Sequence, residues 1–209
     1  MRKLITFILA LAAGTGTLFA VSGTCGENLK WVYDHNVLTI SGTGEMTNYG
    51  NGEEAPWKPQ RTLINGITIL EGVTSIGNSA FFDLPNLNMV TMPNSLASIG
   101  DNAFMSSTLY KVTIPAGVTS IGKYAFVDCA KLTAINVDED NPNYSSKDGV
   151  LFDKKQTTLI QFPAGKNSTS YTIPNSVKTI GDEAFIKCTL LNSVTIPNSV
   201  TGIGNNVFQ

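Results

Sequence analysis

The chain has 209 residues, of which 42% are hydrophobic and only 14% are charged, and its net charge is −2. This composition is typical of a folded protein rather than a disordered one. The small net charge gives no electrostatic basis for binding nucleic acid or an anionic membrane surface.

Residues 1–22 have the layout of a secretory signal peptide. Two cations precede an apolar run over residues 4–13, and small residues follow up to Ala20 and Ser22, the candidate cleavage positions. The apolar run is shorter than the roughly 20 residues that a membrane span needs. We therefore expect a protein that is secreted or held at the cell surface, with no membrane span after signal removal. A lipid-modified N-terminus at Cys25 is the less favoured alternative.

Residues 23–62 are expected to form an N-terminal cap. Segment 28–42 alternates apolar and polar residues on both sides of a turn near residues 34–36, which predicts a β-hairpin. Trp57 then stands close to two prolines. Because the end of a repeat array needs a cover for its apolar side chains, we assign this region to the cap.

A nine-residue motif recurs five times from residue 73 onward. Its copies are VTSIGNSAF, LASIGDNAF, VTSIGKYAF, VKTIGDEAF and VTGIGNNVF, ending at Phe81, Phe104, Phe126, Phe185 and Phe208. A second pattern, L-x-x-V-x-I, marks strands whose last residues are 23, 22, 23, 36 and 23 positions apart. We therefore expect six units over residues 63–209, of which the fourth has 36 residues and the sixth is incomplete.

Each unit is expected to contain a short strand, a second extended piece and a compact helical turn. Alternating β-branched residues indicate the strand, and the proline that follows ends it. The motif glycine is expected to supply backbone angles that other residues avoid, and the x-x-A-F segment to turn Ala and Phe inward. When the units stack, each covers the apolar side chains of its neighbour, which no single unit can bury alone. The predicted fold class is thus an α/β solenoid with a parallel β-sheet on one face and short extended and helical turns elsewhere.

The fourth unit lacks the I-G-x-x-A-F segment and carries residues 141–169 in its place. Two apolar runs, 150–152 and 158–162, flank the polar segment 153–157. This arrangement predicts a β-hairpin that projects from the solenoid or packs over it.

The sequence LYKVTIPAGVTSIGKYAFVDC, residues 109–129, resembles the repeat of BspA-type leucine-rich repeat proteins of bacterial surfaces. The resemblance covers residues 63–209, and the CGENLKW…LTISGTGEM leader over residues 25–46 is also similar. The resemblance implies a leucine-rich-repeat solenoid, export and a protein-binding or adhesive surface. It supplies no catalytic residue. The partners it implies are extracellular or host matrix proteins, or other cell surfaces, and no nucleic acid.

Few residues in this sequence suit catalysis or metal binding. His35, the only histidine, lies in the predicted hairpin turn, where solvation explains it better than a catalytic triad. Segment 137–143 is acidic but lacks the glycine and glutamate spacing of a calcium-binding loop. Cys129 and Cys188 belong to coils two steps apart and are expected to be buried free thiols, whereas Cys25 is expected to be exposed. We predict no catalytic residue, no metal site and no cofactor.

The third and fifth positions of the strand pattern should point away from the core. Together with Tyr144 in the irregular unit they supply the predicted binding residues, which are Met89, Thr91, Lys111, Thr113, Asn136, Tyr144, Ser170, Thr172, Ser193 and Thr195. Threonine also suits exposed strands for purely structural reasons. Two alternatives to a binding module stay open: a spacer or fragment of a longer surface protein, and a secreted hydrolase in the cap.

Overall fold

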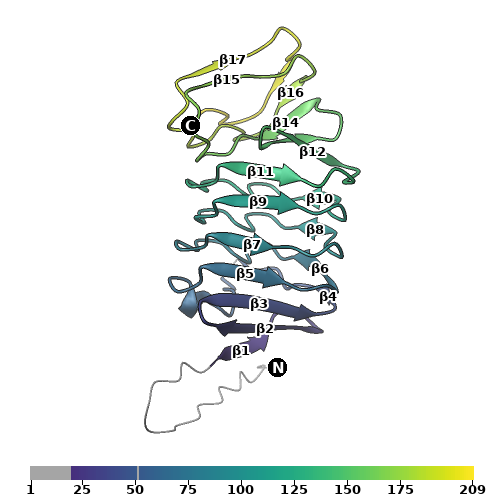
Figure 1. Cartoon of the computed structure of the whole chain (residues 1–209), viewed down its shortest axis with the longest axis vertical. Helices are drawn as coiled ribbons and strands as arrows, with labels where there is room; N and C mark the ends of the chain where they lie inside the picture. The colour runs from purple at the N-terminus through teal and green to yellow at the C-terminus, as the bar shows by residue number, and fades with distance from the viewer. Residues whose placement is uncertain (1–19, 51) are drawn as a thin grey trace.

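Short strands and turns make up nearly the whole described part of the chain, residues 20–50 and 52–209. In this computed structural model the strands stack along one long axis, from the N-terminal hairpin at one end to the last repeat at the other (Figure 1). Most of the predicted signal peptide, residues 1–19, lies outside the described residues.

One strand from each predicted unit lies on the same side of the stack (Figure 1). These strands are β5 (Gly66–Ile69), β7 (Met89–Thr91), β9 (Lys111–Ile114), β11 (Ala134–Val137), β15 (Ser170–Thr172) and β17 (Ser193–Thr195). Paired neighbours run parallel with equivalent positions opposite each other, as with Ile67 and Val90 or Val112 and Ile135. The predicted strands and their parallel pairing are therefore confirmed.

The second extended pieces of the units, together with one short strand of the cap, form further parallel strand pairs. The strands concerned are β4 (Gly44–Glu45), β6 (Val73–Ile76), β8 (Ser98–Ile99), β10 (Ser120–Ile121), β14 (Thr158–Gln161), β16 (Thr179–Ile180) and β18 (Gly202–Ile203). They pair in the order β10-β8-β6-β4 in the first part of the chain and β14-β16-β18 in the last part. The molecule is a β-solenoid whose coils each contribute to two sheets.

The N-terminal cap continues directly into the main sheet. β2 (Leu29–Asp34) and β3 (Val37–Gly42) form the predicted hairpin, and His35 and Asn36 at its turn have φ angles of 45° and 65°. β1 (Val21–Thr24), which the sequence did not predict, pairs antiparallel with β2. Because β3 runs parallel to β5, the hairpin covers the first coil and lengthens the sheet at the same time.

The x-x-A-F segments are turns without helix. Within the described residues the one helical element is the short 3-10 helix η1 (Lys58–Gln60). A left-handed residue stands two positions before each motif phenylalanine, namely Ser79, Asn102, Tyr124, Glu183 and Asn206, with φ between 52° and 61°. A helix needs right-handed φ angles at successive residues, so the predicted helical turn is wrong. The inward direction of Ala and Phe is confirmed, as Ala80 and Phe81 are buried.

The motif glycines serve close approach of coils rather than unusual backbone angles. None of them has a positive φ. A Cβ atom on Gly100 would lie 2.6 Å from the nitrogen of Asn78, and one on Gly122 would lie 2.4 Å from the nitrogen of Asp101. Any side chain would therefore push neighbouring coils apart, which corrects the role predicted for these glycines.

Aromatic rings form two stacked columns inside the solenoid. The first contains Trp57, Phe81, Phe104 and Phe126, and the second contains Phe162, Phe185 and Phe208. Successive ring centroids within a column are 5.2–5.6 Å apart. The sequence motif did not predict Trp57 or Phe162 as members. Trp57 also donates from Nε1 to the carbonyl oxygen of Ala80 at 2.9 Å, which joins the cap to the first repeat.

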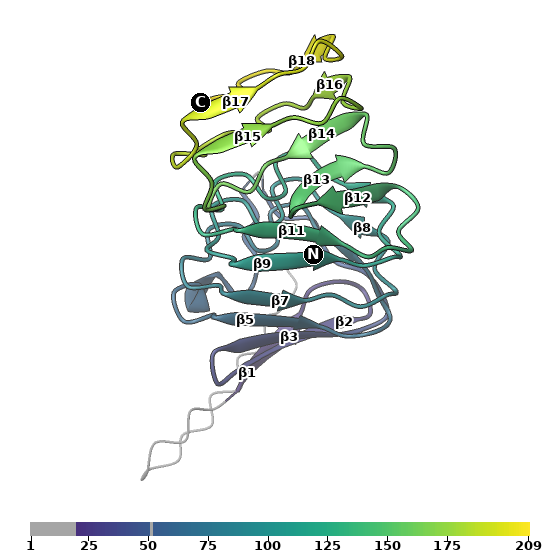
Figure 2. The same cartoon turned by 45° about the horizontal axis from the view of Figure 1, so that its top comes forward.

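The irregular fourth unit separates two hydrophobic cores. Its strands β12 (Tyr144–Lys147) and β13 (Val150–Asp153) form an antiparallel meander with β14, of which only the β13–β14 hairpin was predicted. Figure 2 shows this meander between the first coils and the last two. Leu151 of β13 belongs to the first core, whereas its neighbour Val150 belongs to the second. β14 rejoins the solenoid by pairing parallel with β16.

Asn141 joins the irregular unit to the coil before it. Its side chain is fully buried. Nδ2 donates to the carbonyl oxygens of Pro115 and Val118, both at 2.8 Å. Oδ1 accepts from the N–H groups of Asn143 and Tyr144 at 2.9 and 2.8 Å. All four hydrogen-bonding positions of the amide are used, so the loop begins from a fixed point.

Candidate binding face

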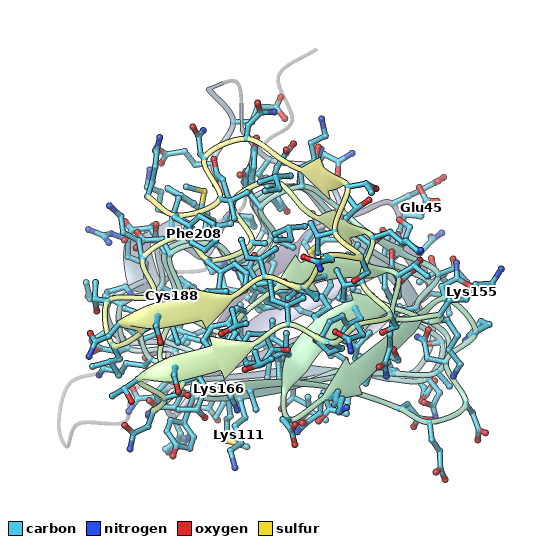
Figure 3. All side chains as sticks on the ribbon, turned by 90° about the horizontal axis from the view of Figure 1, so that it is seen from above. Glu45, Lys111, Lys155, Lys166, Cys188 and Phe208 are labelled. Carbon is cyan, nitrogen blue, oxygen red and sulfur yellow. The ribbon has the colours of Figure 1, made fainter. Side chains whose placement is uncertain are left out.

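Outward side chains lie along β3, β5 and β7 of one sheet and along β9 and β11 of a second, two-stranded sheet beside it. In β9 the side chains of Lys111 and Thr113 are exposed, whereas those of Val112 and Ile114 are buried. Seen down the solenoid axis, Lys111 points away from the stack (Figure 3). We use the term sheet face for Thr39, Thr68, Met89, Thr91, Tyr110, Lys111, Thr113 and Asn136. Strand alternation places all of them except Tyr110 outward, as the sequence pattern indicates, and Tyr110 is exposed directly before β9.

A row of hydroxyl groups runs along the sheet face. Thr39 lies opposite Thr68, which in turn lies opposite Thr91. Further along, Thr113 lies opposite Asn136. Neighbouring strands are about 4.8 Å apart, so these short polar side chains form an almost continuous line. Thr39 was not among the predicted residues, although its L-T-I triplet matches the V-T-I triplets of the repeats.

Two large side chains lie beside this polar row, close to a cation. Met89 is 61% exposed and Tyr110 is 56% exposed. The N–H of Tyr110 donates to the carbonyl oxygen of Asn88 at 3.1 Å, so the two residues begin neighbouring strands. The Lys111 ammonium lies 5.7 Å from the centroid of the Tyr110 ring, a cation–π distance. The sequence pattern did not predict Tyr110, because this residue occupies the second position and strand alternation points only the third and fifth positions outward.

The structure does not bring all the predicted residues together. Ser170 and Thr172 lie on β15, and Ser193 and Thr195 lie opposite them on β17. This pair of strands forms a separate two-stranded sheet beyond the irregular unit. Tyr144 lies on β12, and its hydroxyl accepts a hydrogen bond from the N–H of Ile121 in β10 at 3.0 Å. It therefore holds β12 against the solenoid and does not belong to the sheet face.

A cavity of about 470 Å³ lies between the cap and the first repeat turns, lined by residues outside the sheet face. Tyr49, Trp57 and Phe82 give it aromatic walls. The Arg61 guanidinium donates to the Asp83 carboxylate at 2.7 Å across one side. Because four of its charged groups form the pairs Lys58–Glu54 and Arg61–Asp83, the cavity makes a weaker candidate site than the sheet face.

Reactive groups do not gather at any one place in the described residues. The His35 side chain is 81% exposed in the hairpin turn, 2.7 Å from the Asp34 carboxylate. Residues 20–50 and 52–209 contain no cluster of three or more histidine, cysteine, aspartate or glutamate side chains suited to a metal ion. Over the same ranges, no helix has the length and apolar character needed to cross a membrane. The sheet face is therefore the candidate site.

All three cysteines are free thiols. Cys129 is buried, as predicted, and Cys188 is half-buried. Cys25 is buried as well, which corrects its predicted exposure. Its backbone explains this, because the N–H donates to Leu29 and the carbonyl accepts from Thr47. These bonds hold the residue beneath the cap hairpin.

Burial makes these thiols poor nucleophiles while the protein is folded. It raises the pKa of Cys25 and Cys188 to about 12 and that of Cys129 to about 11. We expect a disulfide reagent at pH 8 to leave the folded protein almost unmodified and to modify all three thiols rapidly in denaturant. Rapid reaction of the folded protein would contradict the buried placement.

The same pKa values predict a loss of stability in alkaline solution. Above the ordinary pKa of 9.0 the unfolded chain releases thiol protons that the folded chain retains. The folded state then binds more protons, so the free energy of unfolding should fall as the pH rises from 9.0 toward the raised pKa values. Denaturant unfolding at several pH values measures this, and a triple cysteine-to-alanine variant should show a shallower fall.

Comparison with known proteins agrees with this architecture. The family described as "BspA type Leucine rich repeat region" matches residues 60–165 and 160–209, with six copies. A leucine-rich repeat protein from Eubacterium ventriosum is 28% identical, with a TM-score of 0.57 over 90% of this chain and 62% of its own. This chain therefore spans less than two thirds of that protein. No curated protein matches the sequence.

Two more distant structures share the fold. A leucine-rich cell surface protein from Faecalibacterium prausnitzii is 21% identical, with a TM-score of 0.63 over 92% of this chain and 74% of its own. The pneumococcal vaccine antigen PcpA is 20% identical, with a TM-score of 0.63 over 92% of this chain and 68% of its own. The six matched copies cover well over half of the sequence, so this chain belongs to the BspA-type leucine-rich repeat family.

Proposed function

We propose that this protein binds another protein through its sheet face, outside the cell or at the cell surface. The observation that carries the proposal is the group of Met89, Tyr110 and Lys111 at the start of neighbouring strands. Tyrosine and methionine are enriched in protein interfaces, and a cation held near an aromatic ring adds an electrostatic attraction. Solenoids of stacked repeats commonly use extended surfaces of this kind for binding.

The surroundings of this group also suit an interface. The row of threonines is uncharged, so covering it requires the removal of no ionic hydration shell. Each hydroxyl donates one hydrogen bond and accepts others, which lets the row pair with varied partner groups.

Export forms the second part of the proposal. Residues 1–22 would direct secretion, and the cap would begin with the mature N-terminus. Cleavage after Ala20 leaves β1 whole, because that strand starts at Val21. Cleavage after Ser22 would remove half of its pairs with β2. We therefore propose Ala20 as the cleavage position, and extracellular matrix proteins or other cell surfaces as the partners. We propose no catalytic role for the chain.

Binding of the mature chain to a panel of purified extracellular matrix proteins tests the function. Biolayer interferometry should give saturable binding to at least one of them. Met89→Glu should weaken that binding at least about tenfold, because it replaces the largest exposed apolar contact of the group with a charge.

The matched control is Leu63→Glu. Leu63 is 54% exposed, similar to Met89, but it precedes the first strand of the repeats and is not part of the sheet face. This variant should bind as the wild-type protein does. Equal weakening by both variants, or loss of binding with Leu63→Glu alone, would place the contact elsewhere.

A further inference from the structure

The turns of successive coils are joined by a regular ladder of backbone hydrogen bonds. The N–H groups of Ser79, Phe81 and Asp83 donate to the carbonyl oxygens of residues 101, 103 and 105. The next coil repeats the pattern, with Asn102, Phe104 and Ser106 donating to residues 123, 125 and 127. In the last part of the chain, Glu183, Phe185 and Lys187 donate to residues 205, 207 and 209. Each coil thus needs three alternate carbonyl groups from the coil that follows.

The ladder is interrupted at the irregular unit. Tyr124, Phe126 and Asp128 occupy the three donor positions of their coil, yet within the described residues their N–H groups have no hydrogen-bond partner. Phe126 is 4% exposed, whereas Tyr124 is 37% exposed and Asp128 is half-buried. The next coil that would supply carbonyl groups is replaced by the β12–β13–β14 meander. These three N–H groups therefore lie where those of the other coils are bonded to the coil that follows.

A cavity occupies the place of the missing turn. Its volume is about 270 Å³, and Phe126, Leu151 and Ile160 form apolar walls beside the polar Gln161. This volume lies below the roughly 300–1,000 Å³ of typical small-molecule sites, so a single large side chain suits it better than a cofactor. The ring of Phe126 stacks on Phe104 on one side, and no aromatic ring of the described residues stacks on the other. Tyr124 and Phe126 line this cavity, whereas Asp128 lies just beyond its lining residues. We call the cavity, with the three N–H groups that follow it along the turn, the slot.

Two further features distinguish the slot from the regular coils. In those coils Asn78, Asp101 and Asp182 accept the backbone N–H of the coil that follows through Oδ1. Lys123 stands at this position beside the slot and has no acceptor to offer. Tyr124 shares the left-handed φ of this position with serine, asparagine and glutamate in the other coils, and differs from them in its aromatic side chain.

We propose that the slot binds a segment of another protein that resembles the chain's own A-F turn. Three alternate carbonyl groups of the segment accept from Tyr124, Phe126 and Asp128, and its aromatic side chain stacks on Phe126. The partner segment thereby accepts the backbone hydrogen bonds that the irregular unit does not accept. This inference deepens the proposed protein-binding function and rests on it, but it uses a site separate from the sheet face.

The carbonyl groups of the chain's own motif copies are already occupied. Ala80 accepts from Trp57 Nε1, and Ala103 and Ala125 accept from Phe81 and Phe104. Residues 184 and 207 accept from Phe162 and Phe185. Within residues 20–50 and 52–209 no motif copy therefore has this carbonyl group free, and we assign the segment that fills the slot to another chain.

A synthetic peptide provides a direct probe. The sequence SIGDNAFMS, residues 98–106, contains the carbonyl groups that cover Phe81 in the folded protein. Fluorescence anisotropy of this labelled peptide should show saturable binding to the full chain. The same peptide with alanine in place of phenylalanine should bind at least about tenfold more weakly, because it lacks the ring that stacks on Phe126. Equal binding of both peptides, or no binding at millimolar concentration, would overturn the proposal.

Two protein variants locate the binding. Thr158 lines the slot, so Thr158→Trp should fill it and weaken peptide binding at least about tenfold. Thr179 lies opposite Thr158 on the next strand but does not line the slot, so Thr179→Trp should leave binding unchanged. Undiminished binding by Thr158→Trp with an unchanged melting temperature would overturn the proposal. If Thr158→Trp does not fold, the comparison of the two peptides still tests the proposal.

Met89→Glu separates this inference from the sheet-face proposal. The variant should bind the peptide as the wild-type protein does, whatever its effect on matrix proteins. Loss of peptide binding by a folded Met89→Glu would contradict a separate slot. Peptide binding without any matrix-protein binding would overturn the sheet-face function alone.

Discussion

Phe104→Ala is expected to lower the free energy of unfolding by about 3–5 kcal/mol. The Phe104 ring is fully buried and stacks on Phe81 and Phe126, with centroid distances of 5.3 and 5.6 Å. Its removal leaves a cavity between two rigid coils, which the backbone ladder prevents from closing. Urea unfolding followed by tryptophan fluorescence measures the loss, because Trp57 lies in the same column.

Phe208→Ala is the matched control at the end of the second column. Its ring stacks on Phe185 at 5.3 Å but is 54% exposed. We expect a loss of about 1 kcal/mol, since much of the ring already contacts water. Equal losses from the two variants would contradict the central position assigned to Phe104.

Asn141→Asp is expected to lower the free energy of unfolding by about 3–5 kcal/mol at neutral pH. The new carboxylate would face the carbonyl oxygens of Pro115 and Val118, which now accept from Nδ2 at 2.8 Å. It would be buried, without a cation and against two acceptors. This environment raises the pKa of the new carboxyl in the folded state, so the loss should shrink as the pH falls and the group is protonated. Urea unfolding at several pH values measures both effects.

Asp140→Asn provides the control one residue away. The Asp140 side chain is exposed, and the hydrogen bond of this residue to Asp138 is made by its backbone N–H. Its substitution should change the free energy of unfolding by about 0.5 kcal/mol or less. If Asn141→Asp unfolds at the same urea concentration as this control, the loop before β12 does not depend on Asn141.

Repeat periodicity predicted the regular parts of the fold because the same residues recur wherever a coil makes the same contacts. The six strands and the inward direction of Ala and Phe follow from that recurrence. The helical turn was predicted wrongly because side chains as different as Ser79 and Glu183 occupy the same left-handed position. Nothing in their chemistry marks that conformation, which the turn adopts in all five motif copies.

The irregular unit was less predictable because its contacts occur once. Phe162 starts the second aromatic column, yet it stands in the sequence LIQFPAG without the repeat motif. The hydroxyl of Tyr144 bonds to the backbone of β10, a pairing between segments whose approach depends on the meander. For the candidate site, strand alternation indicated Met89 and Lys111. It could not show that the meander would separate Ser170 and Ser193 from them.

Radical footprinting tests the central claim, binding at the sheet face, most directly. Hydroxyl radicals oxidise exposed methionine and aromatic side chains, and Met89, Tyr110 and Phe82 are all about half exposed or more. In the complex with a matrix protein that binds, we predict that oxidation of Met89 and Tyr110 slows strongly. Phe82, which lines the cavity beside the cap, should react as in the free protein. Unchanged oxidation of Met89 and Tyr110 in a saturated complex would contradict the account.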